Sequence, residues 1–191
     1  MTTDATAQKI TPETGLAHRV LVHSRSRAVI QAPLDKVDIP EWLFNLGDEE
    51  YQRCSVDHIA AGSNRAPNGR RMSLNVEEIG GSFIVQHYVE DITEKNHCRV
   101  ISTSDVFVVG SRTTVHVAWE LMVTPLTEST CQFTNIVLVH TTDNYEEFLD
   151  KNGIPFEQAR AAMETAVGAH NAEETPLFAK SIEAKTLLIR L

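Results

Sequence analysis

Residues 155–188, PFEQARAAMETAVGAHNAEETPLFAKSIEAKTLL, form the last long stretch of the chain and are rich in helix-favouring residues. In a helix, residues separated by alternating steps of four and three lie on one face. Here that face is apolar except at two adjacent turns, and it comprises Met163, Val167, His170, Glu174, Leu177 and Ser181, with Phe178 and Ile182 beside them. The sequence therefore predicts one long C-terminal helix that packs this face against the rest of the chain.

The two exceptions on this face are His170 and Glu174, which lie four residues apart. A carboxylate in a core-facing stripe needs a partner, because an unpaired buried charge is too costly to stay ionised. A metal ion would satisfy both side chains. A hydrogen bond between the two, or a position at a solvated edge, would satisfy them as well, so the helix alone leaves these interpretations open.

The sequence before the helix alternates strand-like stretches with short turns. The expected strands span residues 19–31, 71–79, 82–92, 98–109, 112–123 and 131–140, with a short helix near residues 40–46, a turn or short helix within 48–61, and an irregular segment before the long helix. This order predicts an α+β fold. The simplest packing curves an antiparallel sheet around the C-terminal helix and leaves an internal cavity for a small ligand.

The stretch 71–79 has a polar and an apolar set of alternating residues. Met72, Leu74 and Val76 share a face with Glu78, whereas Glu77 belongs to the opposite face. Because the first set is otherwise apolar, Glu78 is expected to point inward and Glu77 toward solvent. The two glycines that follow, at positions 80 and 81, predict a bend or bulge.

Length and charge restrict the class of protein. The 191 residues suffice for one domain with a sizeable core, which we expect to span residues 17–191 after a frayed tail at 1–16. A net charge of −9 argues against a nucleic-acid or anionic-membrane partner. There is no secretory leader pattern and no run of 18 apolar residues. The three cysteines fit no disulfide framework, so a cytoplasmic protein is expected.

The element order, the opening segment VIQAPLDKV at residues 29–37 and the closing helix together resemble the START/Bet v1-like superfamily. This superfamily includes lipid-transfer proteins, plant hormone-binding proteins and polyketide cyclases. The resemblance covers roughly residues 17–190 and implies the helix-grip fold. It also implies a hydrophobic pocket, without specifying one chemistry.

A narrower resemblance concerns the order of short polar motifs, namely Glu50-Tyr51, Asp57-His58, EEIGG at 77–81, His140, and HNAEE at 170–174. This order is similar to that of the diacetylphloroglucinol hydrolases, helix-grip enzymes that use zinc to cleave the bond between an aromatic ring and an acetyl group. The resemblance implies a zinc site and nearby substrate contacts. The implied ligands are His58, Glu78, His170 and Glu174, and the implied substrate contacts are Tyr51 and His140.

One alternative concerns the set of metal ligands. His87, on a strand with an ambiguous inward face, could replace His58 as a ligand if the loop carrying His58 points outward. The expected function is that of a metal-dependent hydrolase or lyase, with zinc as the ion, acting on a small aromatic or polyketide-like ketone. The alternative is a non-catalytic carrier of a small hydrophobic ligand. A homodimer formed through a sheet edge or strand face also stays open.

Overall fold

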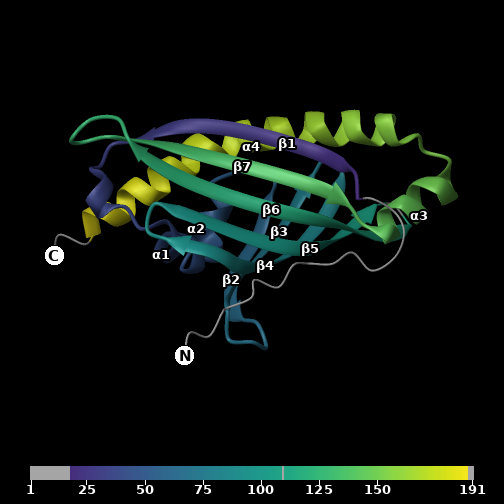
Figure 1. Cartoon of the computed structure of the whole chain (residues 1–191), viewed down its shortest axis with the longest axis horizontal. Coiled ribbons are helices and arrows are strands. Elements are labelled where there is room, and N and C mark those ends of the chain that lie inside the picture. The colour runs from purple at the N-terminus through teal and green to yellow at the C-terminus, as the bar shows by residue number, and fades with distance from the viewer. Residues whose placement is uncertain (1–17, 109, 189–191) are drawn as a thin grey trace, which may run out of the picture.

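The computed structural model describes residues 18–108 and 110–188, so the prediction for residues 1–16 lies outside the described part. One curved antiparallel sheet dominates the molecule and lies along the long helix α4 (Figure 1). Its strand order is β1-β7-β6-β5-β4-β3-β2. The strands are β1 (Val20–Ile30), β2 (His58–Arg65), β3 (Arg71–Ile79), β4 (Ser82–Glu94), β5 (His97–Val108), β6 (Ser111–Pro125) and β7 (Cys131–Thr141).

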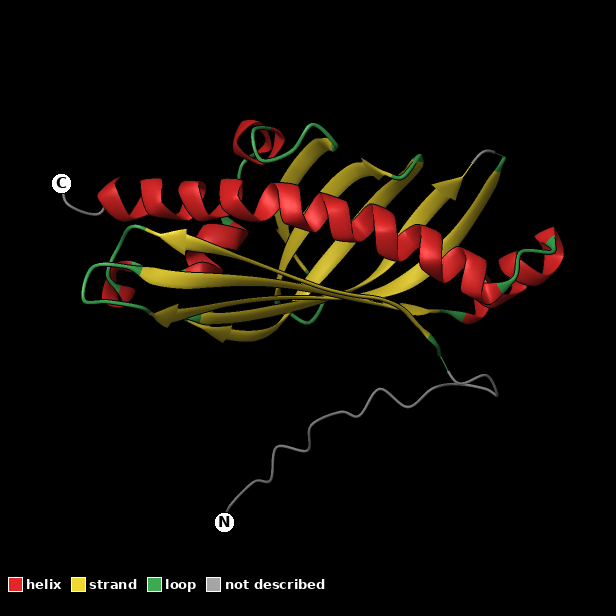
Figure 2. Cartoon of the chain, turned by 90° about the horizontal axis from the view of Figure 1, so that it is seen from above, coloured by secondary structure: helices red, strands yellow, loops and turns green. Residues whose placement is uncertain are grey.

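The helices pack on one side of this sheet, and Figure 2 shows α4 running along its length. They are the 3-10 turn η1 (Leu34–Lys36) and the helices α1 (Ile39–Phe44), α2 (Asp48–Gln52), α3 (Asp143–Asn152) and α4 (Phe156–Leu188). β1 and β2 are the two edge strands of the sheet, although they follow each other in the sequence. The segment that contains η1, α1 and α2 therefore connects opposite edges. The predicted α+β helix-grip fold is confirmed.

The predicted core face of α4 is the buried one. Val167, His170, Glu174, Phe178 and Ile182 are all buried, and Met163, Leu177 and Ser181 are half-buried at its margin. The Phe178 ring is the centre of an aromatic cluster, 5.2 Å from the Trp42 ring and 5.8 Å from the Trp119 ring. The long helix is therefore held mainly by apolar packing against the concave side of the sheet.

The predicted orientation of β3 is wrong. Glu77 is 5% exposed and faces the concave side, whereas Glu78 is exposed on the other side. Ser73 and Asn75 are also buried on the concave side, and Ser73 donates a hydrogen bond of 2.9 Å to Asn75. The inner face of this strand is polar because its side chains pair with one another, so apolar content does not mark the interior here.

The predicted bend at residues 80–81 is a two-residue hairpin between β3 and β4. Gly80 and Gly81 both have positive φ, +58° and +78°, as a tight hairpin requires. A Cβ atom on Gly80 would lie 2.9 Å from Cβ of Ala166 on α4. The glycine thus allows the hairpin to approach α4 closely.

Two elements differ from the sequence-based expectation. The segment expected to be irregular contains α3, which begins where Thr142 accepts a hydrogen bond of 3.1 Å from the Tyr145 backbone and ends at Gly153 in the left-handed conformation. The region around His58, expected to be a turn or short helix, continues into β2. A capping residue at one end and glycine at the other are the signals that predict α3.

An ion pair ties the start of β1 to α3. Nε of Arg19 donates to Oε1 of Glu146 at 3.0 Å, a second guanidinium nitrogen contacts Oε2, and the guanidinium lies 3.7 Å over the Phe156 ring. The hydrogen bonds from Arg19 outweigh partial burial and lower the pKa of Glu146. A carboxyl whose folded-state pKa is depressed stabilises the fold above its unfolded pKa, and this contribution disappears as the pH falls.

We therefore expect Glu146→Gln to lower the free energy of unfolding by about 1 kcal/mol at pH 7. The difference from the wild type should shrink as the pH falls below about 4, where the unfolded carboxyl takes up its proton. Urea denaturation at pH 7 and pH 3 measures both values. Glu147→Gln is the matched control, because Glu147 is exposed on the same helix. An equal loss in the two variants would contradict the assignment.

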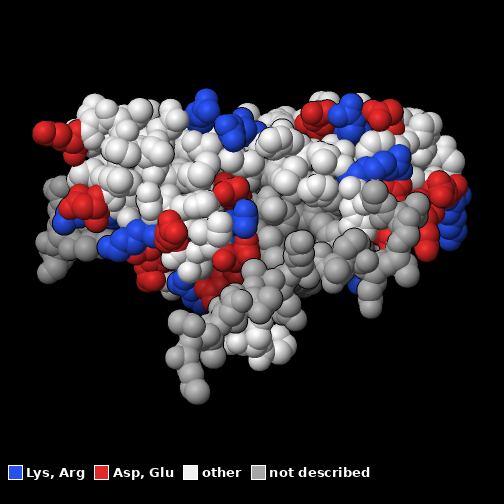
Figure 3. Space-filling view, in the orientation of Figure 1, with Lys and Arg blue, Asp and Glu red and all other residues white. Residues whose placement is uncertain are grey.

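Charged side chains are dispersed on the face of the molecule that Figure 3 displays, with Lys and Arg interspersed among Asp and Glu. Within residues 18–108 and 110–188, none of the helices combines the length and apolarity needed to cross a lipid bilayer. All three cysteines are buried, and none of them forms a disulfide bond.

Candidate metal centre

Three side chains from two distant parts of the sequence converge on the concave side of the sheet. Nε2 of His58 lies 3.3 Å from Nε2 of His170 and 3.2 Å from Oε2 of Glu174. The distance from Nε2 of His170 to that same oxygen is 3.4 Å. All three side chains are buried. These residues could hold a metal ion.

The sides of this triangle fit a small divalent cation. Zinc binds imidazole nitrogen and carboxylate oxygen at about 2.0–2.1 Å, so neighbouring ligand atoms of a tetrahedral site lie about 3.3–3.4 Å apart. The three distances, 3.2, 3.3 and 3.4 Å, match that separation. Two imidazoles and carboxylate oxygen also form a donor set that suits zinc.

The other nitrogen of each imidazole has an acceptor. Nδ1 of His58 lies 2.7 Å from the backbone oxygen of Tyr51, and Nδ1 of His170 lies 3.3 Å from Oδ2 of Asp57. A carbonyl or carboxylate can only accept, so each Nδ1 carries the proton. Both Nε2 atoms then turn toward the common centre. Such outer partners orient histidine ligands in metal sites.

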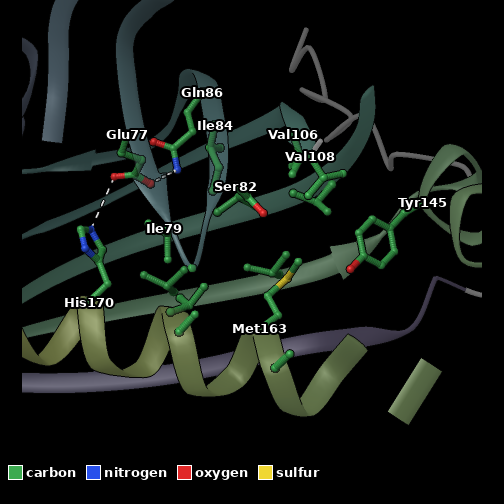
Figure 4. A pocket seen from close by; sticks show the side chains of 18 of the residues that line it. Glu77, Ile79, Ser82, Ile84, Gln86, Val106, Val108, Tyr145, Met163 and His170 are labelled. Carbon is green, nitrogen blue, oxygen red and sulfur yellow. Dashed lines mark hydrogen bonds and ion pairs between the residues drawn. The ribbon is translucent and has the colours of Figure 1, made fainter. Parts of the chain in front are cut away.

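Glu77 supplies a second carboxylate beside the triangle. Its Oε2 lies 3.5 Å from Nε2 of His170 and 3.7 Å from Nε2 of His58. The hydroxyl of Tyr51 donates to Oε2 at 2.8 Å, and Nε2 of Gln86 donates to Oε1 at 2.8 Å. Figure 4 shows Glu77 between His170 and Gln86 at one end of the cavity. Glu77 therefore occupies the place that the sequence assigned to Glu78.

A hydrogen-bond chain from the sheet fixes Glu174. Nε1 of Trp119 donates to Oδ1 of Asn135 at 2.8 Å, which sets the orientation of the Asn135 amide. Nδ2 of Asn135 then donates to Oε1 of Glu174 at 3.0 Å. One oxygen of Glu174 is thus held by β7, which leaves Oε2 facing the two histidines.

The electrostatics of the cluster favour a cation. Burial disfavours the charged imidazole, but hydrogen bonds and charges from Glu174 and Glu77 outweigh it and raise the pKa of His170 to about 11. Burial likewise opposes ionisation of Glu174, yet the two histidines lower its pKa. A proton on His170 can supply the positive charge in the metal-free protein, and a bound metal would replace it.

Tyr51 forms one wall of the centre. Its ring stacks on the His58 ring with centroids 3.7 Å apart and planes 4° from parallel. Burial, followed by the charges of Glu77 and Glu174, raises the pKa of Tyr51 well above its ordinary value. The phenol therefore stays protonated near neutral pH and acts as a hydrogen-bond donor.

Three residues that the sequence placed near this site lie elsewhere. Glu78 is exposed, because successive residues of a strand point to opposite faces. His87 is exposed as well, so the alternative that replaces His58 with His87 is wrong. His140 is half-buried and pairs with His116 in the β6–β7 register, whereas its neighbour Val139 lines the cavity. His140 therefore faces away from the pocket.

A cavity of about 330 Å³ extends from the cluster of Glu77, His170 and Glu174 between the sheet, α3 and α4. Figure 4 shows His170 at one end and Tyr145 of α3 at the other. Most of the wall is apolar or aromatic, and it includes Ile79, Ile84, Tyr88, Val106, Val115, Val117, Trp119, Val139, Phe148, Leu149, Met163 and Val167. The pocket thus combines one polar end with an apolar body, as small-molecule sites commonly do.

The fold and the cavity define a helix-grip protein, and comparison with solved structures agrees. The Zhui aromatase/cyclase from Streptomyces sp. R1128 is 12% identical, with a TM-score of 0.61 over 92% of this chain and 97% of that chain. The di-domain aromatase/cyclase StfQ of the steffimycin pathway is 12% identical, with a TM-score of 0.54 over 88% and 52%. At this identity the likeness shows a shared fold.

A START superfamily protein from Mycobacterium smegmatis is 13% identical, with a TM-score of 0.49 over 91% of this chain and 99% of that chain. No protein-family model matches the sequence. The sequences of curated proteins also give no match.

Sequence reasoning missed several residues of the centre. Glu77 was placed on the solvent side, and Gln86 and Asn135 received no role. Ile79 is buried and lies two residues after Glu77, so the two side chains share one face of β3. Placing Ile79 in the core would therefore have predicted that Glu77 points inward. No comparable signal marked Asn135, because its partners Trp119 and Glu174 are distant in sequence.

Proposed function

We propose that this protein is a zinc-dependent hydrolase or lyase that acts on a small aromatic or polyketide-like ketone. The observation that carries the proposal is the convergence of His58, His170 and Glu174 with spacings that match zinc ligands. Glu77 would be the further oxygen ligand or the adjacent base. The resemblance of the polar motifs to those of the diacetylphloroglucinol hydrolases supports the same chemistry.

The cavity supports the substrate class. Its apolar and aromatic wall suits a flat or polyketide-like body, and the polar groups lie together at one end. Two solved structures with the same fold are named as aromatase/cyclases, a name that refers to the formation of aromatic rings. A zinc ion bound at the polar end would polarise a ketone oxygen and lower the pKa of a bound water to about 7.

Residues around the centre would accept and donate the protons that the reaction transfers. Carbon–carbon cleavage of an aryl ketone requires a water proton to leave and a proton to reach the departing ring carbon. The Glu77 carboxylate, oriented by Tyr51 and Gln86, would accept the first. Tyr51, which stays protonated and lines the cavity, would donate the second and then recover a proton from the Glu77 carboxyl through their hydrogen bond. His140 has no part in this scheme because it faces away from the pocket.

The test combines metal analysis with a substrate panel. Protein purified without a histidine tag is analysed for metal by plasma mass spectrometry. It is then assayed on phenols that carry an acetyl group on a ring carbon and on β-diketones. We expect near-stoichiometric zinc, release of acetate from at least one compound, and loss of turnover after chelation. Zinc binding without turnover of any compound in the panel would leave a metal-binding carrier as the better description.

Adjacent carboxylates on β3 provide a matched pair of variants. Glu77→Gln removes the buried charge beside both histidines, whereas Glu78→Gln removes an exposed charge one residue away. We expect Glu77→Gln to lower zinc affinity at least about 10-fold, the lower end of the range for outer-shell partners, and Glu78→Gln to leave it unchanged. Competition with a fluorescent zinc chelator measures both. Equal affinities in the two variants would exclude Glu77 from the centre.

A second candidate function is supported by the same cluster. His170, Glu77 and Glu174 can satisfy one another as an ion-paired network, with the pKa of His170 raised to about 11. The protein would then be a carrier of a small hydrophobic molecule, with these groups bonding the polar end of the ligand. Native mass spectrometry separates the two functions, because a carrier is expected to show a bound small molecule and no metal even after zinc addition.

A further inference from the structure

The polar end of the cavity contains a donor without a partner. Asn75 is 1% exposed and lines the cavity on β3. Its Oδ1 accepts a hydrogen bond of 2.9 Å from Ser73, whereas its Nδ2 is buried and has no acceptor. A buried donor left unpaired costs free energy, so an acceptor atom of a bound ligand that pairs with it would be bound favourably.

A second donor lies on the neighbouring strand. Tyr88 of β4 is 3% exposed and lines the same cavity, with its ring 5.4 Å from the Trp119 ring. Its hydroxyl makes no hydrogen bond with any residue that the structure describes. Burial, followed by the charges of Glu77 and Glu174, raises its pKa well above the ordinary value. Tyr88 therefore presents a protonated hydroxyl near the carboxylates of the centre.

The sheet register brings the two donors together. Asn75 pairs with Gln86, and Ser73 pairs with Tyr88, so Asn75 and Tyr88 are diagonal neighbours on the concave face. Such neighbours lie within reach of long side chains. Asn75 also precedes Glu77 by two residues on that face, which corresponds to about 6.6 Å along the strand. The Asn75 side chain also faces the Tyr51 hydroxyl and offsets part of the rise in the Tyr51 pKa, although no hydrogen bond of normal geometry joins the two side chains.

We propose that Asn75 and Tyr88 form a binding site for a second oxygen of the ligand, separate from the oxygen that meets the metal centre. Both groups donate, so the site takes a carbonyl, hydroxyl or enolate oxygen. The ligand class is accordingly an aromatic or polyketide-like ketone with a further oxygen on the same compact skeleton. The proposed function accounts for the ligand oxygen at the metal centre, and the inference rests on it for that oxygen. The site for the second ligand oxygen rests only on Asn75 and Tyr88.

The experiment compares acetophenone with 2′-, 3′- and 4′-hydroxyacetophenone, which move one hydroxyl around the same ring. Dissociation constants are measured by isothermal titration calorimetry on the zinc-loaded protein. We expect at least one isomer to bind about five- to tenfold more tightly than acetophenone, the effect of one added hydrogen bond. Tyr88→Phe and Asn75→Leu should each reduce this preference about fivefold while both probes still bind.

The preference is the ratio of the affinity for the preferred hydroxyacetophenone to the affinity for acetophenone. This ratio corrects for changes in cavity volume, because such changes affect the binding of both compounds. Tyr88→Phe removes one hydroxyl and is the conservative variant should Asn75→Leu fold poorly. Tyr145→Phe makes the same chemical change at the opposite end of the cavity and should preserve the ratio. The proposal is overturned if no isomer is preferred, if both variants keep the full preference, or if Tyr145→Phe alone removes it.

Repeating the titrations on chelator-treated protein separates this inference from the proposed function. If the protein binds no zinc yet shows a hydroxyl preference that depends on Tyr88 and Asn75, the proposed metal chemistry fails and the oxygen site stands. If zinc binds and the preference is absent or independent of both residues, the oxygen site fails and the metal centre stands.

Discussion

His170→Ala is expected to remove zinc from the protein. Its Nε2 is within 3.5 Å of His58, Glu174 and Glu77, so it lies at the centre of the proposed ligand set. Loss of an outer partner alone lowers metal affinity by about 10- to 100-fold, and loss of a ligand should exceed about 100-fold. Plasma mass spectrometry after dialysis measures the remaining zinc.

The controls address folding and chance binding. His87→Ala removes a histidine that is exposed on the other face of the sheet, and it should retain all zinc. His170→Ala leaves two buried carboxylates without their cation, so we expect reduced stability and would verify folding by circular dichroism. Glu174→Gln removes a ligand while keeping the side-chain volume. Full zinc retention in both Glu174→Gln and His170→Ala would rule out this centre.

Phe178→Ala is expected to cause the largest loss of stability. The side chain is completely buried and contacts the rings of Trp42, Trp119 and His58 at centroid distances of 5.2 to 5.8 Å. Truncating a buried phenylalanine costs about 3–5 kcal/mol, because transfer energy is lost and a cavity is left. Urea denaturation of the chelator-treated protein isolates this packing effect from any change in metal binding.

Leu187→Ala on the same helix is the matched control, since Leu187 is 55% exposed. We expect its free energy of unfolding to stay within about 0.5 kcal/mol of the wild type. A loss below about 1 kcal/mol in Phe178→Ala would mean that the aromatic cluster is loosely packed or rearranges. The position of α4 on the sheet would then depend on other contacts.

The helix and most of the strands could be predicted from local patterns. The spacing of Val167, His170, Glu174 and Phe178 identified the buried face of α4, and a helix shows such a face over many turns. The same rule failed on β3, where Glu78 shares a face with three apolar residues at alternate positions but is exposed on the convex side of the sheet. In a short strand one polar cavity wall is enough to invert the pattern, because alternation gives two faces without naming the inner one.

The sequence by itself determined an α+β chain with a long helix that carries His170 and Glu174 toward the core. Only the tertiary structure decided that Glu77 joins them, that His140 and His87 do not, and that Asn135 holds Glu174. The reason is physical. Helical neighbours meet through local geometry, whereas a site built from β2, β3, β7 and α4 depends on sheet register and curvature, which long-range packing sets.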